Sequence, residues 1–143
     1  MKKSLPLVVE RVVADTKSLQ TQVSSEFNSL LYQEDQLITC KKKCNHCCHR
    51  PVRIPVTEGI LLYRWLAANG QWVPSLKKRL EDVSAKTLGL THKIWRLSNI
   101  PCPLLSDEGL CLAYEARPLH CRTTYSILDA KLCHPHEERS YTI

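Results

Sequence analysis

The sequence predicts a small, mainly helical single domain built around a cysteine-rich site, with one minor β-hairpin. Three observations lead to this prediction. Apolar residues recur at spacings of three, four and seven over much of the chain, which is the pattern of amphipathic helices. Four of the 8 cysteines fall within the short stretch 40–48, so their side chains are expected to share one site. The 143 residues suit one domain, which at this size buries ~68–70% of the surface that the unfolded chain exposes.

The longest predicted helix covers residues 4–38. Ser4 is its expected cap, and Pro6 is tolerated in the first turn of a helix. An apolar stripe follows the helix and comprises Val12, Leu19, Val23, Phe27, Leu30, Leu31, Leu37 and Ile38. We expect this stripe to pack on the rest of the domain, with a homodimer surface as the alternative, because its spacing is not a strict heptad.

Three further helices are expected at residues 57–68, 74–88 and 91–98. Thr57 is the expected cap of the first, Asn69-Gly70 its stop signal, and Gly89 ends the second. The inward-facing residues are expected to be Leu61, Leu62, Trp65 and Leu66, then Leu76, Leu80, Val83 and Leu88, then Ile94, Trp95 and Leu97.

After Pro101 and Pro103, residues 104–112 read as a small hairpin with its turn at 106–109. A single helical turn is expected over 114–117, because Pro118 ends it. Ser126 with Asp129 three residues later indicates the start of another short helix, which carries Cys133.

Composition points to an ordinary globular protein. Hydrophobic residues make up 43% and charged residues 24%, so neither a disordered nor a membrane class is indicated. The basic start is followed by an apolar run that breaks at Glu10-Arg11, and we therefore expect no secretion signal and a cytoplasmic location. Thiols stay reduced there, which favours metal ligation over disulfides for the cysteines.

The eight cysteines are the candidate site residues: Cys40, Cys44, Cys47, Cys48, Cys102, Cys111, Cys121 and Cys133. At about 100° per residue the first four would share one face of a helix, and a loop could gather them equally well. Crowded thiolates repel one another unless a cation or a covalent bond compensates. Metal ligation, disulfide formation and a redox role are thus the candidate explanations.

Spacing bears on which metal would bind. A local zinc ribbon does not fit, because Cys44 and Cys47 are the one Cys-x2-Cys pair in the sequence. Ligands from separated segments suit an iron–sulfur cluster better than one tetrahedral zinc ion, so we favour iron slightly over Zn2+; two four-thiolate zinc sites use eight cysteines equally well. Five of the 6 histidines lie within three residues of a cysteine, and we assign them supporting or surface roles.

The net charge of +6 is at least partly compensation for thiolates, since each four-thiolate zinc site carries a charge of about −2. The charge alone does not predict a nucleic-acid surface, because no recognised binding motif accompanies it.

The sequence resembles a known family in two parts. The run Cys40-x3-Cys44-Asn-His-Cys47-Cys48-His49, followed by Val-Arg-Ile-Pro-Val-Thr-Glu, is similar to the opening motif of a bacterial cysteine-cluster family of zinc- or iron-chelating domains. The later segment from Cys102 to Cys133, with Arg117-Pro118 and Cys121-Arg122, matches that family's second half in the same order. The resemblance implies that the eight cysteines are metal ligands and that Arg117, Pro118 and Arg122 shape the site.

On this basis the chain divides into an N-terminal amphipathic helix at 1–39, a cysteine-cluster metal-binding domain at 40–136 and a polar tail at 137–143. Its predicted function is to hold an iron–sulfur cluster or zinc through the cysteine cluster. Two alternatives remain open at this point, a thiol redox sensor and an iron–sulfur enzyme, because one related group comprises flagellin lysine methylases. The four glycines form no phosphate-binding loop and no substrate site is recognisable, so the sequence leaves open whether the protein is an enzyme.

Overall fold

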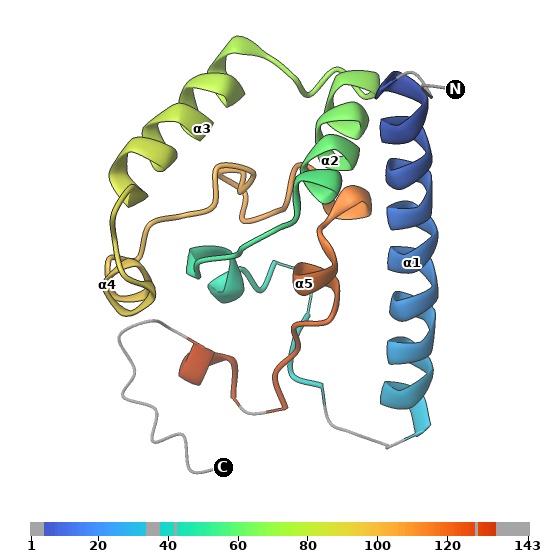
Figure 1. The fold of residues 1–143 in the computed structure, drawn as a ribbon. Helices are drawn as coiled ribbons and strands as arrows, with labels where there is room; N and C mark the ends of the chain where they lie inside the picture. Colours follow the sequence, from blue (N-terminus) through green and yellow to red (C-terminus); the bar gives the residue numbers. More distant parts are fainter. Residues whose placement is uncertain (1–4, 34–37, 42, 128, 134–143) are drawn as a thin grey trace.

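The computed structural model describes residues 5–33, 38–41, 43–127 and 129–133. It is mainly helical, and the α-helices and 3-10 helices (η) in chain order are α1 Leu5–Gln33, η1 His46–His49, α2 Val56–Ala68, α3 Pro74–Thr87, α4 His92–Leu97, η2 Tyr114–Ala116, α5 Leu119–Arg122 and η3 Ala130–Cys133. Helix α1 runs along one side with α2 beside it, and α3 and α4 form the opposite side (Figure 1). The short helices η1 and α5 lie between these two sides.

Helix α1 packs against α2 and α5, and Val13 is its buried contact residue. An exposed ion pair, in which Nη1 and Nη2 of Arg64 each donate to a carboxylate oxygen of Glu10, joins α1 to α2 at 2.8 and 2.5 Å. The predicted apolar stripe is only partly used, because Leu19 and Leu30 are exposed. The predicted cap Ser4 and the predicted last turn at 34–37 lie outside the described residues, and residues 38 and 39 are not helical.

The core lies where α2 and α3 meet the segment that follows α4. It contains the buried residues Leu66, Leu76, Leu104 and Ala113. Leu66 and Leu76 are the largest fully buried side chains, as their helical spacing predicted. Helix α2 begins at Val56 with Pro55 at the N-cap position, so the prediction that Thr57 caps it is wrong.

Two glycines end helices as predicted. Gly70 follows α2 with φ +67°, and Gly89 follows α3 with φ +77°, a left-handed backbone that glycine adopts without steric cost. Leu88, which was expected to face inward, is 84% exposed because it lies at the C-cap, where the chain leaves the helix.

Helix α4 is capped by Thr91, whose side-chain oxygen accepts from the backbone N–H of Ile94 at 3.3 Å. Ile94 and Leu97 are exposed, and Trp95 is half-buried. The expectation that all three face the core is therefore wrong. A helix of six residues has room for less than two turns, so a single side chain can supply its contact with the core.

The hairpin prediction is also wrong, because the structure has no strand among its described residues. The chain does reverse at this point, since Ser106 N–H donates to Leu110 O at 2.8 Å and Leu112 N–H donates to Leu104 O at 2.8 Å. A single isolated bridge pairs Leu105 with Cys111. The ladder cannot extend, because Pro101 and Pro103 precede it without N–H groups and the chain enters η2 directly after it.

The last short helix begins later than predicted. Its 3-10 turn starts at Ala130, and Leu132 N–H donates to Asp129 O at 2.9 Å, so Ser126 lies before the helix. The described helices also include none that combines the length and the apolar character needed to cross a bilayer.

Candidate metal centre

A tight turn followed by η1 presents the first cysteines. Lys43 takes a positive φ of 71°, and Cys44 N–H donates to Lys41 O at 2.9 Å. Cys47 and Cys48 then lie within η1, where Cys48 N–H donates to Asn45 O at 2.9 Å. With about three residues per turn in a 3-10 helix, adjacent cysteines leave this segment in different directions.

The segment after α4 brings two more cysteines to η1. Cys102 N–H donates to Cys48 O at 2.7 Å, and Leu105 N–H donates to Cys102 O at 3.0 Å. Because Leu105 is also bridged to Cys111, Cys102 and Cys111 lie on the same closed turn. Both cysteines pack against the buried core, and this packing restricts their positions.

Helix α5 carries Cys121, and its position depends on a residue of α2. The carboxylate of Glu58, at 6% exposure the one buried charged side chain among the described residues, accepts from the backbone N–H of Leu119 at 2.9 Å. The same Glu58 oxygen accepts from Gln20 Nε2 at 2.5 Å. Glu58 thus joins α1, α2 and the first residue of α5, two positions before Cys121.

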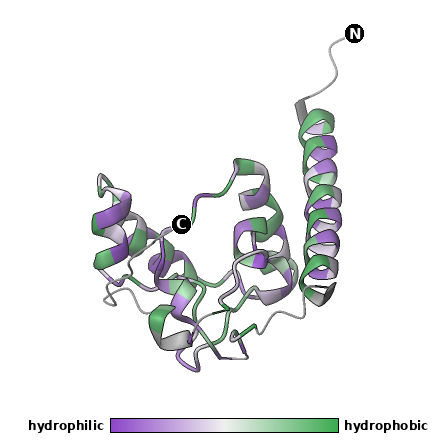
Figure 2. Ribbon diagram, turned by 90° about the horizontal axis from the view of Figure 1, so that it is seen from below, coloured by the Kyte–Doolittle hydropathy of each residue, from purple (hydrophilic) through white to green (hydrophobic). Residues whose placement is uncertain are grey.

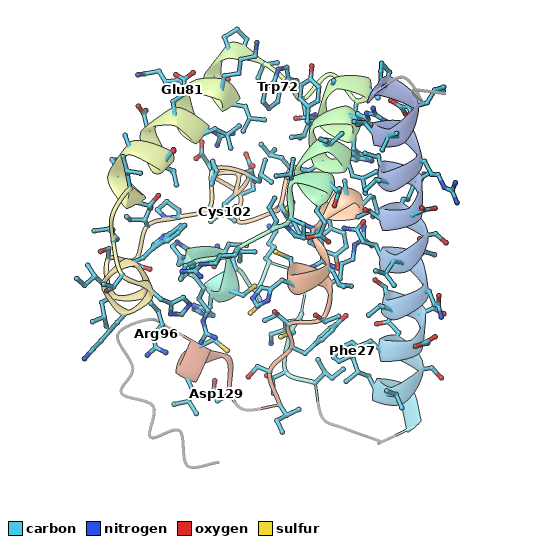
Figure 3. All side chains as sticks on the ribbon, in the orientation of Figure 1. Phe27, Trp72, Glu81, Arg96, Cys102 and Asp129 are labelled. Carbon is cyan, nitrogen blue, oxygen red and sulfur yellow. The ribbon has the colours of Figure 1, made fainter. Side chains whose placement is uncertain are left out.

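Hydrogen bonds join the segment at residues 39 and 40 to Ser126, which follows α5 in the chain. Thr39 N–H and its hydroxyl both donate to Ser126 O at 2.9 Å, and Ser126 N–H donates to Cys40 Sγ at 3.2 Å. Helix η3, which carries Cys133, contacts η1. Sulfur atoms from these segments gather between η1, α5 and η3, with Cys102 on the adjoining loop (Figure 3).

All eight cysteines are free, and Cys47 alone among them is exposed. A hydrogen bond from the Cys48 thiol is the main cause that lowers the pKa of Cys47 to about 6, with help from the charges of Arg117 and Arg50. The same hydrogen bond raises the pKa of Cys48 strongly. The hydrogen bond between the two thiols therefore favours ionisation of Cys47 and opposes ionisation of Cys48.

Burial is the main cause that raises the pKa of each of Cys40, Cys102, Cys111 and Cys121, the last to about 12. The charges of neighbouring thiolates divide the cysteines into two groups. The outer group comprises Cys40, Cys44 and Cys133. The negative charges of Cys44 and Cys133 raise the pKa of Cys40. The inner group comprises Cys48, Cys102, Cys111 and Cys121. The negative charges of Cys102 and Cys111 raise the pKa of both Cys48 and Cys121. Cys47 interacts with members of both groups.

Arg117 is the cation that acts on several of these thiols. Its charge lowers the pKa of Cys47 and opposes the raised pKa of Cys111 and Cys121. The guanidinium lies 3.8 Å from the ring centroid of Tyr114, and its Nε donates to Tyr114 O at 3.2 Å. Stacking on an aromatic ring holds an arginine in one orientation.

The second predicted arginine, Arg122, acts on the backbone. Its Nε donates to Arg117 O at 2.6 Å, and its Nη2 donates to Glu115 O. Arg122 therefore supports the turn that presents Arg117. Pro118 is buried and occupies the N-cap position of α5.

Sequence reasoning missed two supports of the site, Glu58 and Arg79. Arg79 on α3 donates to Leu105 O at 3.2 Å, and its charge lowers the pKa of Cys102, although burial keeps that pKa raised. In the sequence Arg79 belongs to the basic triplet at residues 77–79, whose charge could only be weighed as part of a nucleic-acid surface. Glu58 is an acidic residue in the first turn of its helix, a common position that by itself indicates dipole compensation.

The comparisons with known proteins bear on this site. The model of the CxxCxxCC family, described as "Putative zinc- or iron-chelating domain", matches residues 39–139. The chain belongs to this family. The match covers more than half of the chain and includes every cysteine of both groups, so it confirms the resemblance found in the sequence. No curated protein and no solved structure matches the chain.

The donor set fits the metals that the CxxCxxCC family description names. Free thiols are soft ligands that bind zinc and iron–sulfur centres, and Arg50 Nε, beside the cluster, is a buried donor without a hydrogen-bond partner. Across the described residues, no three His, Cys, Asp or Glu side chains converge closely enough to hold one ion in common. The assignment of each cysteine as a ligand is therefore a proposal.

Proposed function

We propose that this CxxCxxCC protein binds iron, as an iron–sulfur cluster, through thiolates drawn from its eight cysteines, and that the bound metal links the segments that carry them. The observation that supports this proposal most directly is that segments carrying free thiols meet at η1. Cys102 N–H donates to Cys48 O, and η3, which carries Cys133, contacts η1. Zinc bound by the same thiols is the alternative. We also propose a cytoplasmic location, since a reducing compartment keeps thiols available as metal ligands.

The preference for iron rests on how the inner group is assembled. Its members come from η1, from the turn after α4 and from α5, so they approach from separate directions. A cluster of several irons accepts thiolates from such separated segments, whereas structural zinc sites use compact knuckles. A bound cluster would supply one-electron redox chemistry or a structural cross-link.

The chain's own residues prepare this site in three ways. Burial favours the protonated form of the inner thiols, so a cation is needed to hold them as thiolates. Arg117 places a fixed positive charge near three of the eight cysteines. Glu58 fixes the start of α5 and thereby the position of Cys121. Metal binding should consequently raise the stability of the fold.

Purification of the full chain without oxygen, followed by metal and sulfide analysis and a visible spectrum, tests the proposal. We expect a brown protein with broad absorption near ~400 nm and equal amounts of iron and sulfide. Cys121→Ser should lower both the metal content and the melting temperature, whereas Ser25→Ala, an exposed control on α1, should change neither. A colourless protein with one or two zinc ions per chain would replace iron by zinc, and a metal-free protein would refute both.

A thiol redox role is the second candidate, and one observation favours it. Cys47 is the exposed member of an adjacent pair, which is the arrangement of a thiol that oxidants reach first. This role predicts reversible oxidation of Cys47 while the metal content stays constant. Mass spectrometry of thiol-blocked protein before and after peroxide treatment distinguishes it from oxidative loss of the metal.

A further inference from the structure

Arg50 directly follows η1, and its backbone is held on both sides. Its N–H donates to Cys47 O at 3.2 Å, which closes the last turn of η1. On the other side lies Pro51, which is buried. A residue before proline is restricted to extended backbone, and Arg50 has this conformation, with φ −105° and ψ 147°. The Arg50 side chain therefore starts from a fixed backbone directly beside Cys47 and Cys48.

The Nε atom of Arg50 is a buried donor without a hydrogen-bond acceptor. Figure 2 shows hydrophilic residues, in purple, on segments in the middle of the view as well as on the outer helices, and polar groups need hydrogen-bond partners wherever they are buried. Among the described residues, Ser24 Oγ on α1 is the other buried side-chain atom without a partner, but it belongs to a neutral hydroxyl. The guanidinium N–H is more costly to bury, because it carries part of a positive charge.

The other arginines of the site each have an acceptor. Arg117 and Arg122 donate from Nε to a backbone carbonyl, and Arg79 does so from Nη1. These three arginines therefore hold turns of the chain in place. Among the described residues neither a carbonyl nor a carboxylate accepts from Arg50 Nε, so this atom is left for a different kind of acceptor.

The cysteine sulfurs are the acceptors that metal binding would create beside Arg50. The guanidinium lies close enough to Cys47 for its charge to act on that thiol. A protonated thiol is a weak hydrogen-bond acceptor, whereas a thiolate is a charged and strong one. Metal binds the thiolate form. Metal binding thus turns the sulfurs of this site into the acceptors that a guanidinium N–H prefers.

We propose that Arg50 donates a hydrogen bond from Nε to a metal-bound thiolate of the cysteine cluster and thereby stabilises the metal-bound state. This inference rests on the proposed function, but it holds for zinc as well as for iron, because thiolates bind both. Hydrogen bonds to a metal ligand orient the ligand and raise the metal affinity. Arg50 acts through such a ligand, so it is a positioning residue.

Two variants of Arg50 separate the hydrogen bond from the charge. Arg50→Lys keeps the positive charge but has a methylene group in place of Nε. Arg50→Gln removes the charge but keeps a donor, because the glutamine Nε2 lies the same number of bonds from Cα as the arginine Nε. Arg53→Lys is the matched control, since Arg53 is exposed on the segment that follows Pro51.

Competition between the full chain and a chelator for Zn2+, with reductant present, measures the metal affinity of each variant. We expect Arg50→Lys to lower the affinity about 10–100-fold and Arg50→Gln to lower it less, with Arg53→Lys unchanged. In metal-free protein Arg50→Lys should leave the urea midpoint of unfolding unchanged or raise it, because the variant removes an unpaired buried donor. A lower midpoint would show that Arg50 supports the fold itself and would overturn the proposal.

The order of the two variants decides between the hydrogen bond and the charge. Equal zinc affinity in the wild type and Arg50→Lys would overturn the proposal. A weaker affinity in Arg50→Gln than in Arg50→Lys would do the same, since the charge alone would then act on the site. In both of these outcomes the wild type still binds metal, so the proposed function stands. Wild-type protein that takes up neither zinc nor iron would instead refute the proposed function, and this inference with it.

Discussion

Replacement of Glu58 by alanine removes the acceptor on which α1, α2 and α5 converge. The buried carboxylate accepts one hydrogen bond from Leu119 N–H and one from Gln20 Nε2. Hydrogen bonds to a charged acceptor contribute about 1.5–3 kcal/mol each, and the two donors would lose their partner together. We therefore expect Glu58→Ala to lower the free energy of unfolding by about 3–6 kcal/mol.

Glu58→Gln separates the hydrogen bonds from the charge. The amide oxygen of glutamine still accepts from Leu119 N–H, and the side chain of Gln20 can turn its own oxygen toward the new amide nitrogen. We expect a loss of only about 1 kcal/mol for this variant. Glu81→Ala, an exposed acidic residue on α3, should stay within about 0.5 kcal/mol of the wild type.

Urea unfolding followed by circular dichroism measures these differences as shifts in the midpoint at constant slope. The unfolding should be measured on metal-free, reduced protein, so that loss of metal does not contribute to the difference in stability. The reasoning would be refuted if Glu58→Ala behaved like Glu81→Ala, since the three helices would then be held by other contacts. Equal losses for Glu58→Ala and Glu58→Gln would instead show that the charge, and not the hydrogen bonds, carries the effect.

Three further predictions follow from burial, backbone geometry and thiol ionisation. Leu76→Ala should cost about 3–5 kcal/mol in urea unfolding, because the side chain is fully buried and leaves a cavity; a loss below 1 kcal/mol would contradict this. Gly109→Ala should lower the melting temperature more than Gly70→Ala, since both glycines have positive φ but only at 109 would the new Cβ meet Asn45 Nδ2 at 3.1 Å. Burial raises the pKa of Cys121 to about 12, so the metal-free fold should lose on the order of 2 kcal/mol as the pH rises from about 9 to 11, where only the unfolded thiol ionises. Across this pH range the urea midpoint of unfolding should fall less steeply with pH for Cys121→Ser than for the wild type. Identical pH dependences would contradict a raised pKa of Cys121 in the fold.

Much of the helical framework could be predicted from the sequence, because it depends on local signals. Apolar periodicity placed α2 and α3 to within a residue or so, and Gly70 and Gly89 marked where these helices end. Exposure could not be predicted in the same way. Periodicity shows that a helix has an apolar side, but whether Ile94 or Leu19 is buried depends on which elements lie against that side, and this is set by the whole fold.

In the candidate site, too, some features follow from local sequence and others depend on the whole fold. The residue types and their spacing single out the cysteines as candidate ligands, and the structure adds that the charge of Arg117 lowers the pKa of Cys47. The outer and inner groups could not be foreseen, because they arise from contacts between distant parts of the chain, such as the one between Cys40 and Ser126. The contact of Glu58 with Leu119 was missed for the same reason.

The hydrogen bond from Ser126 to Cys40 Sγ has a consequence for the timing of synthesis. Cys40 leaves the ribosome about 90 residues before Cys133, and at roughly 5–20 residues per second it waits some 5–18 s for η3, the last segment of its surroundings, to emerge. During that interval the thiols of residues 40–48 have neither their Ser126 donor nor the later cysteines beside them. We therefore expect metal to enter only after translation has passed η3, and the yield of loaded protein to depend on how well the cell keeps nascent thiols reduced.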